Sequence, residues 1–314
     1  MPSNIMVITG PTATGKTALG ILLAKEFNGE VVSADSMQIY QRMNIGTAKP
    51  TPEEMGEIPH HMIDIVDPAE PYSVAQYVSD ASHCVDNILS RGKLPIVVGG
   101  TGLYIDSLIS GRTFADHPGN PSVRQTLLDR YDAIGGEAMR LELAKVDPER
   151  AEKLHPRDKR RIIRALEVFQ LTGKTITQHD KETRELPPRY HAAQIALTFA
   201  DRTALYERID RRVDCMVEAG LFDEVRTLLA EGLDAHCTAM QAIGYKEVVR
   251  ALNGELRAQE AIDLIKQESR RYAKRQLTWL RRNPDLCWIR WEGQPNFEKA
   301  RQSSTSFAYN CGIQ

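Results

Sequence analysis

The feature that most constrains this chain is the segment Gly10–Thr17, whose sequence GPTATGKT fits the pattern G-x-x-x-x-G-K-[ST]. The apolar run Ile5–Ile8 precedes it as a buried strand would, and Ala18–Phe27 follows with its leucines at helical spacing. In a strand–loop–helix context, the glycines let successive backbone N–H groups face phosphate oxygens, and the helix N-terminus adds its positive end. The segment therefore predicts a loop that binds a di- or triphosphate.

All eight residues of this loop are candidates for diphosphate binding: Gly10, Pro11, Thr12, Ala13, Thr14, Gly15, Lys16 and Thr17. The Lys16 ammonium would supply positive charge to the terminal phosphates, and the Thr17 hydroxyl is the natural ligand for Mg²⁺. The pattern leaves open whether the diphosphate carries a nucleoside or another group.

Further apolar runs predict a sheet. Val31–Ser33 and Pro95–Val98 are each bounded by glycine or polar residues, and Tyr72–Leu89 between them has helical spacing. Alternating strands and helices predict an α/β fold with a parallel, P-loop NTPase-like sheet. Ligands of such sheets bind at the carboxyl ends of the strands.

After Gly111 the pattern changes to short amphipathic helices, and Pro187-Pro188 ends this region. We therefore predict a mainly helical insertion at residues 114–189, within a catalytic core formed by residues 1–113 and 190–314. The strand-like Gln194–Phe199 returns the chain to the sheet. Long helices are expected after it, at about 202–231, 240–252 and 257–282.

Composition excludes several classes of protein. The 314 residues are 42% hydrophobic and 26% charged, which is typical of a globular protein and excludes a disordered chain. No run approaches the ~18 apolar residues of a membrane-spanning helix, and the N-terminal segment lacks the pattern of a secretory signal. The five cysteines form no C-x-x-C pair. Reduced thiols and a cytoplasmic location, with no membrane partner, are expected.

Charge is distributed unevenly. Residues 1–100 carry 6 Lys/Arg and 11 Asp/Glu, whereas the remainder carries 34 and 31. Basic residues of the second part cluster at 157–164 and 266–282. Such clusters could bind a large anionic partner, or they could be solvated helix faces.

Two polar segments follow predicted strands. Asp35 ends the strand after the phosphate loop, where small-molecule kinases tend to place an acidic substrate-binding residue, so it is a candidate general base. A helix-cap or turn aspartate is the alternative. Gly99-Gly100-Thr101-Gly102 ends the third predicted strand, and Thr101 offers a hydroxyl there. Both segments are expected at the same sheet edge as the phosphate loop.

These segments together resemble the tRNA dimethylallyltransferase family, also called tRNA isopentenyltransferase. The resemblance extends over almost the whole chain and is carried by Gly10–Thr17, Asp35–Tyr40, Gly46–Pro50, Gly99–Tyr104, His155–Glu167, Gln241–Tyr245 and Lys274–Arg281. It implies transfer of a dimethylallyl group from its diphosphate to N6 of the adenosine at position 37 of tRNA, immediately 3′ of the anticodon. Some eukaryotic members carry a C-terminal zinc finger, which this chain lacks, so it resembles the bacterial type.

The resemblance also implies roles for residues. Asp35, Lys16, Thr17 and Arg212 would be catalytic, with Mg²⁺ on Thr17. Contacts to the anticodon stem-loop of tRNA would be made by Asp35, Ser36, Met37, Gln38, Thr101, Arg124, Arg160, Arg161, Arg164, Gln241, Gly244, Tyr245, Lys246, Lys274, Arg275, Gln276 and Arg281. The insertion would clasp the stem-loop. Gln276 is available for base edges, and Trp279 is either a stacking platform or a core anchor.

Two other functions share parts of this pattern. A P-loop kinase of a nucleoside, nucleotide or other small metabolite would use the same loop, Mg²⁺ and an acidic residue after the second strand, but it has no need for the basic cluster at 266–282. An RNA-binding GTPase or ATPase would require guanine-specifying or Walker B signatures, which we do not find. The expected assembly is a monomer.

Overall fold

The computed structural model describes residues 3–112 and 120–313, except for the side chain of Arg184. The chain forms two compact units, one comprising Met1–Ile109 with Arg189–Gln314 and the other Ser110–Pro188. The predicted insertion start at 114 lies outside the described residues, and the second unit ends one residue before the predicted 189.

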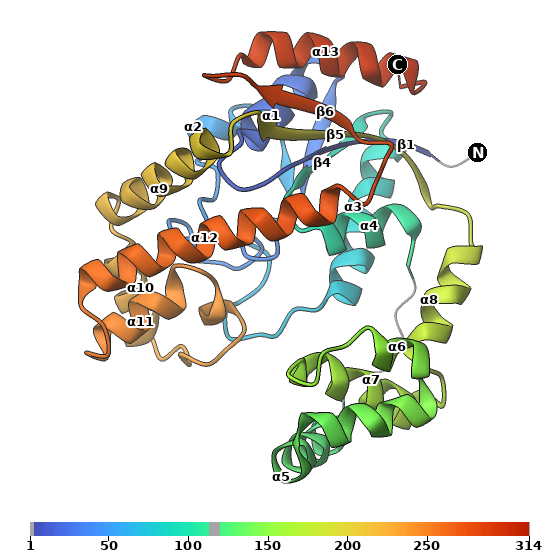
Figure 1. The fold of residues 1–314 in the computed structure, drawn as a ribbon. Helices are drawn as coiled ribbons and strands as arrows, with labels where there is room; N and C mark the ends of the chain where they lie inside the picture. Colours follow the sequence, from blue (N-terminus) through green and yellow to red (C-terminus); the bar gives the residue numbers. More distant parts are fainter. Residues whose placement is uncertain (1–2, 113–119, 314) are drawn as a thin grey trace. The chain divides into compact units, whose positions relative to one another are not determined.

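The first unit is built on a six-stranded sheet (Figure 1). The strands lie in the order β3 (His60–His61), β2 (Gly29–Ser33), β4 (Leu94–Gly99), β1 (Ser3–Thr9), β5 (Tyr190–Phe199) and β6 (Cys287–Trp291). Each of these strand pairs is parallel. The parallel α/β sheet predicted from the apolar runs is therefore confirmed, and the carboxyl ends of β1, β2 and β4 lie at one edge.

Helices cover both faces of the sheet because the strands are apolar on both sides. On one face, α1 (Lys16–Glu26) and α13 (Phe297–Asn310) lie beside each other, and Leu19 and Leu23 of α1 pack on Met6 and Ile8. On the other face, α3 (Val74–Ser90) contacts β2 and β4. The ring of its Tyr77 stacks on Tyr104 of α4 (Gly102–Ser110).

A helical layer lies beside the carboxyl edge of the sheet. It contains α9 (Arg202–Glu218), α10 (Leu221–Ala230), the short 3₁₀ helix η1 (Ala239–Gln241), α11 (Tyr245–Leu252) and the long α12 (Ala258–Leu280), which contacts α9 and α11. The single helix expected at 202–231 is instead two helices. Gly220 has a φ of 100°, a left-handed conformation that ends α9 and starts α10. The one-turn helix α2 (Pro52–Met55) precedes β3.

In the second unit, the regular elements among the described residues are helices. Its helices are α5 (Pro121–Val146), α6 (Pro148–Glu152), α7 (Lys159–Thr172) and α8 (Ile176–Glu185). Gly135, with a φ of 81°, interrupts the helical geometry of α5 and kinks it. Met139, Leu143 and Ile162 are fully buried in a core of its own.

Within residues 3–112 and 120–313, no helix has both the length and the apolar character needed to cross a bilayer.

Candidate active site

The phosphate loop adopts a conformation that requires its glycines. Gly10 has a φ of 145°, and a Cβ there would lie 2.4 Å from the carbonyl oxygen of Leu197 on β5. Gly15 has a φ of 85°, and its Cβ would lie 2.6 Å from the ring of Phe297. Ala13 also has a positive φ, of 65°. The loop is therefore a compact turn packed against β5 and α13.

Three side chains from distant parts of the chain hold this loop. The Trp291 indole N–H donates to the Thr14 carbonyl at 3.1 Å, and the Arg208 guanidinium donates to the Ala13 carbonyl at 3.2 Å. The Gln276 side chain accepts from the Thr12 N–H at 3.0 Å and donates to the Gly100 carbonyl at 2.9 Å. Because the loop is already fixed, less of its conformational entropy is lost when a diphosphate binds.

Lys16 is the charged group of the loop. Its ammonium donates to the Pro11 carbonyl at 2.8 Å, so it folds back over the turn that would hold phosphate oxygens. Burial and the nearby Arg212 guanidinium lower the pKa of Lys16 to about 8, although the negative charge of Asp35 acts to raise it. An incoming diphosphate would stabilise the ammonium that these surroundings destabilise.

Asp35 lies beyond the end of β2, beside the glycine-rich turn after β4. Its Oδ1 accepts from the Met37 N–H at 2.9 Å, while the Thr101 hydroxyl accepts from the Ser36 N–H at 3.2 Å. The Thr101 N–H donates to the Ala34 carbonyl at 3.2 Å. The predicted meeting of Asp35 and Thr101 at one sheet edge is therefore observed.

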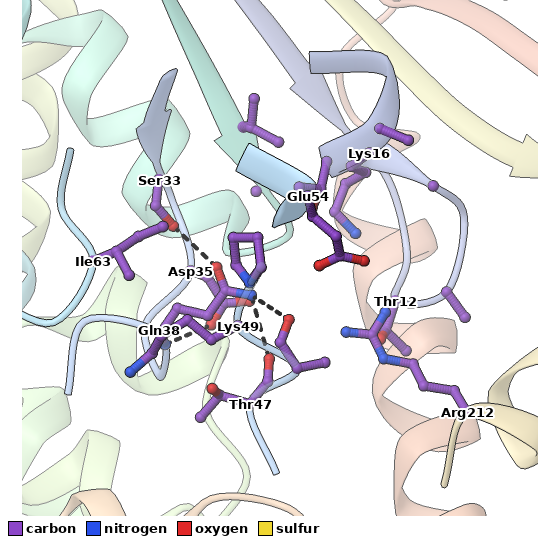
Figure 2. A pocket seen from close by; sticks show the side chains of 18 of the residues that line it. Thr12, Lys16, Ser33, Asp35, Gln38, Thr47, Lys49, Glu54, Ile63 and Arg212 are labelled. Carbon is purple, nitrogen blue, oxygen red and sulfur yellow. Dashed lines mark hydrogen bonds between the residues drawn. The ribbon is translucent and has the colours of Figure 1, made fainter. Parts of the chain in front are cut away.

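A cavity of about 580 Å³ opens in front of the phosphate loop. Thr12, Lys16, Asp35 and Arg212 all line it. Figure 2 shows Lys16 and Arg212 on the side of this cavity opposite Gln38. Cations and a carboxylate thus line one cavity, which suits an anionic substrate that reacts with a proton-donating second substrate.

A second cavity, of about 400 Å³, adjoins the first. Five residues line both cavities: Thr12, Asp35, Thr47, Arg212 and Tyr272. The second cavity extends between α9, α11 and α12, where Met216, Ile243 and Ile265 give it apolar walls. Asp35 and Arg212 therefore lie where two substrate-sized volumes meet.

Burial perturbs the ionisable groups at this junction. It lowers the pKa of Arg212, and the charges of Asp35 and Glu54 partly restore it. Burial, with the charge of Asp35, raises the pKa of Tyr272 to about 12, so its phenol stays protonated at neutral pH. The junction therefore contains a cation and a neutral hydrogen-bond donor beside a carboxylate.

The residues present fit a magnesium ion that binds together with a diphosphate. The Thr17 hydroxyl lines the first cavity and has no hydrogen-bond partner among the described residues, and the carboxylates of Asp35 and Glu54 line the same volume. Mg²⁺ commonly uses one or two protein oxygens and takes its other ligands from phosphates and water. The described residues contain no cluster of three or more His, Cys, Asp or Glu side chains that would hold a metal alone.

Several predicted RNA contacts border the second cavity: Ser36, Met37, Gln241, Gly244, Lys246 and Arg275. Lys274 and Arg281 of the same group are exposed, whereas Gln38 lines only the first cavity. Two others differ from the expectation. Tyr245 is fully buried with its hydroxyl 2.5 Å from Glu224, and Gln276 is 7% exposed with its side chain bound to Thr12 and Gly100. Both side chains thus have hydrogen-bond partners within the protein, and Gln276 also lines the first cavity.

Trp279 acts as an anchor. Its indole N–H donates to Asp106 at 2.8 Å, and a Cβ on Gly102 would lie 2.3 Å from its ring. It lines neither of the two cavities. Of the two predicted roles for Trp279, the structure supports packing between α12 and α4.

The remaining predicted RNA contacts belong to the second unit. Arg160 and Arg161 are exposed at the start of α7 and form no ion pair with the residues that the structure describes. Arg164 and Arg124 approach Glu167 at 2.9 and 3.6 Å. Because Glu167 is fully buried, these two arginines also compensate a buried charge within the helical unit.

The residues that line the first cavity without having been predicted as site residues include four with ionisable side chains: Lys49, Glu54, His60 and Tyr272. The Nε2 of His60 is buried without a hydrogen-bond partner, while its Nδ1 contacts the Ile58 carbonyl at 2.8 Å. The segment Gly46–Pro50 was recognised by resemblance only and contains Lys49. No local pattern distinguishes Tyr272 from other residues of a charged helix, so only the fold reveals it.

Comparison with known proteins agrees with this geometry. Residues 38–283 match the family model described as IPP transferase, and residues 3–64 match the one described as isopentenyl transferase. The chain is 47% identical over 304 residues to a tRNA dimethylallyltransferase of Thermoanaerobacter sp. (strain X514), covering 96% of each chain. It is 48% identical over 313 residues to one of Caldanaerobacter subterraneus subsp. tengcongensis, covering 99% of each.

Solved structures give the same result. A full-length tRNA isopentenylpyrophosphate transferase from Bacillus halodurans superposes with a TM-score of 0.74 at 42% identity, over 99% of this chain and 97% of that one. A eukaryotic dimethylallyltransferase described as acting on tRNA superposes with a TM-score of 0.82 at 30% identity, over 98% and 80%. The small-molecule kinase alternative is not favoured. By sequence, fold and site, the chain belongs to the tRNA dimethylallyltransferase family, whose members are prenyl-transferring enzymes.

Proposed function

We propose that this protein transfers the dimethylallyl group of dimethylallyl diphosphate to N6 of the tRNA adenosine immediately 3′ of the anticodon, releasing diphosphate. The observation that carries the proposal is the junction of the two cavities at Asp35 and Arg212. The phosphate loop borders the first cavity, and predicted RNA contacts border the second. Two substrates that enter separately would thus meet at a carboxylate and a guanidinium.

The first cavity suits the leaving group. As the C1–O bond of the substrate breaks, negative charge develops on the diphosphate oxygens, and C1 gains allylic carbocation character. Lys16, Arg212 and the loop N–H groups would stabilise that charge, since Lys16, Arg212 and the phosphate loop line the first cavity. Mg²⁺, held by Thr17 with Glu54, would supply further positive charge to the diphosphate when bound.

The second substrate supplies the nucleophile. The exocyclic amine of adenine is a poor nucleophile because its lone pair is delocalised into the ring. As the N6–C1 bond forms, Asp35 would accept the proton that N6 loses. The electron pair of the broken C1–O bond would leave with the diphosphate. A positioned general base of this kind contributes typically about 10²- to 10⁴-fold.

The target base must leave its stack to reach this depth. The apolar walls of the second cavity, formed by Met216, Ile243 and Ile265, would accept the purine, and Lys246 and Arg275 would contact the nearby backbone. A single-stranded anticodon loop lowers the cost of unstacking. The exposed arginines of α7 would contact the stem, in a complex of one protein chain with one tRNA.

The test is product formation. The protein, Mg²⁺, dimethylallyl diphosphate and unmodified tRNA are incubated, and the digested RNA is examined by mass spectrometry for N6-dimethylallyladenosine. A tRNA in which guanosine replaces the adenosine 3′ of the anticodon is the matched control. Product with the first tRNA alone supports the proposal. Equal product with both would refute the proposed position, and consumption of ATP with a small acceptor instead would refute the activity.

A further inference from the structure

The loop of residues 43–49 contributes to both cavities. Thr47 lines both, Ala48 and Lys49 line the first, and Gly46 lines the second. The segment contains no regular secondary structure, so contacts with neighbouring elements must hold it in place. A loop that shapes both substrate volumes must be fixed if the substrates are to meet in one geometry.

Glu224 of α10 provides such a contact. Its carboxylate accepts from three successive backbone N–H groups, at 2.8 Å from Asn44, 2.7 Å from Ile45 and 3.1 Å from Gly46. The Tyr245 hydroxyl donates to the same carboxylate at 2.5 Å. Successive N–H groups that converge in this way form an anion-binding concavity, and bonds to a charged acceptor are stronger than bonds between neutral groups. One side chain of α10 thus fills the concavity of the loop.

Close packing reinforces this arrangement. A Cβ on Gly46 would lie 2.4 Å from the ring of Tyr245 and 2.9 Å from Leu221. At its other end the loop is tied down by the Lys49 ammonium, which donates to the Tyr40 carbonyl at 2.8 Å and contacts Asp64. Glu224 and Lys49 therefore hold the two ends against different elements.

A hydrogen-bonded path connects the loop to Asp35. The Gln38 side-chain amide donates to the carbonyls of Thr47 and Ala48 at 3.3 and 3.1 Å (Figure 2). The Gln38 backbone N–H in turn donates to Asp35 Oδ1 at 3.4 Å. The path from α10 to the proposed base therefore has two steps, the loop and Gln38.

We propose that Glu224 is a positioning residue for the transfer reaction: by filling the concavity of the 43–49 loop, it holds Gln38 and, through Gln38, the Asp35 carboxylate. This inference rests on the proposed function. Glu224 lines neither cavity, so it touches neither substrate. Substitution of Glu224 is therefore expected to lower the rate of the chemical step and to leave the affinity for the diphosphate nearly unchanged.

Glu224→Gln is the main test, because the carboxamide places an NH₂ group where the loop presents N–H donors. Glu231→Gln is the matched control, since the exposed Glu231 also pairs with the residue before the loop, Arg42, at 2.6 Å. Hydrogen exchange of the amides of residues 44–46 should accelerate at least about tenfold in Glu224→Gln and stay unchanged in Glu231→Gln. The single-turnover rate with both substrates bound should fall by about 10- to 100-fold. The Kd of dimethylallyl diphosphate should change less than about threefold.

A double substitution separates positioning from general destabilisation. If Glu224 acts through Gln38, then Glu224→Gln should slow the single-turnover rate by less than about threefold in a Gln38→Ala background. An equal loss in both backgrounds, or faster exchange with an unchanged single-turnover rate, would overturn the inference. Glu224→Gln could fail to fold, and the milder Glu224→Asp then provides the test. The shorter aspartate keeps the charge but not the same contacts with the loop, so a Glu224→Asp protein that folds and reacts like wild type would also overturn the inference. A wild-type protein that makes no product is a distinct failure, because it removes the proposed function itself.

Discussion

The backbone N–H of Thr12 donates to the side chain of Gln276 at 3.0 Å, and this bond joins the phosphate loop to the long helix α12, 264 residues later in the chain. The same side chain donates to Gly100 in the turn after β4. One buried carboxamide thus sets the spacing between the diphosphate loop and the glycine-rich turn that flanks Asp35. The site depends on this spacing because the phosphate loop follows β1, whereas Asp35 and the glycine-rich turn follow β2 and β4.

Replacing Gln276 should therefore weaken both the fold and diphosphate binding. Gln276→Leu leaves the Gly100 carbonyl and the Thr12 N–H without their partner, which costs about 1–3 kcal/mol of unfolding free energy. Denaturant unfolding and isothermal calorimetry with dimethylallyl diphosphate measure the two effects. Gln267→Leu, at an exposed position of the same helix, is the matched control and should be neutral. An equally stable Gln276→Leu with unchanged affinity would contradict the bridging role.

Gly15→Ala should weaken diphosphate binding by roughly 5- to 150-fold. The backbone there has a φ of 85°, and the added methyl would lie 2.6 Å from the Phe297 ring, so the loop must shift. Strain of this kind costs about 1–3 kcal/mol. Gly293→Ala is the control because a Cβ at Gly293 meets no heavy atom within 4 Å. Binding of the diphosphate by Gly15→Ala with wild-type affinity would refute the packing described for the loop.

Diphosphate affinity should fall as the pH rises through about 8. Lys16 has its pKa lowered to about 8 in the free protein, so it loses its charge above that value. Bound diphosphate stabilises the ammonium and raises this pKa again, so binding takes up a proton near pH 8.5. The affinity loss can reach about tenfold per pH unit. Calorimetry in buffers of different ionisation enthalpy measures the uptake.

Lys16→Gln provides the control for this pH dependence. It should bind the diphosphate weakly and without the Lys16-dependent proton uptake. The sign for stability is opposite to that for binding. Because the folded pKa lies below the ordinary value of 10.5, the unfolded chain binds more protons between these values, and the Lys16 contribution to unfolding free energy rises with pH there. Identical proton uptake by wild type and Lys16→Gln would contradict the assignment.

The exposed arginines of α7 should govern the salt dependence of tRNA binding. Arg160→Ala/Arg161→Ala should raise the Kd of tRNA and reduce the slope of log K against log salt by about 1 to 2. Arg130→Ala/Lys153→Ala removes two charges from the same unit, each ion-paired in the structure. This control should leave the slope nearly unchanged. Fluorescence anisotropy over a salt series gives both slopes, and equal slopes for the two double variants would contradict the proposed contact.

Much of the core follows from local patterns in the sequence. The apolar runs at 5–8, 31–33 and 95–98 are buried strands, and burial on both faces makes such runs recognisable. The phosphate loop, Asp35 and Thr101 meet as expected, because the carboxyl ends of parallel strands share one sheet edge. Motifs that follow neighbouring parallel strands in the sequence thus lie close together in the fold, where they form one site.

Other features depend on tertiary contacts that no local pattern records. β6 was not predicted because it has only five residues, of which only Trp291 is buried. α13 was not predicted because it packs against α1, which lies at the other end of the sequence. Tyr245 and Gln276 look like surface residues of basic segments, but the fold buries them. Tyr272 enters the site only because α12 crosses both cavities.

The central claim is that Asp35 accepts the N6 proton at the junction of the two cavities. The most direct test is the single-turnover rate of prenyl transfer by wild type and Asp35→Asn, with dimethylallyl diphosphate and tRNA both saturating. The asparagine keeps the size of the side chain but removes the basic oxygen, so the rate should fall about 10²- to 10⁴-fold while both substrates still bind. A rate within a few fold of wild type would contradict the claim.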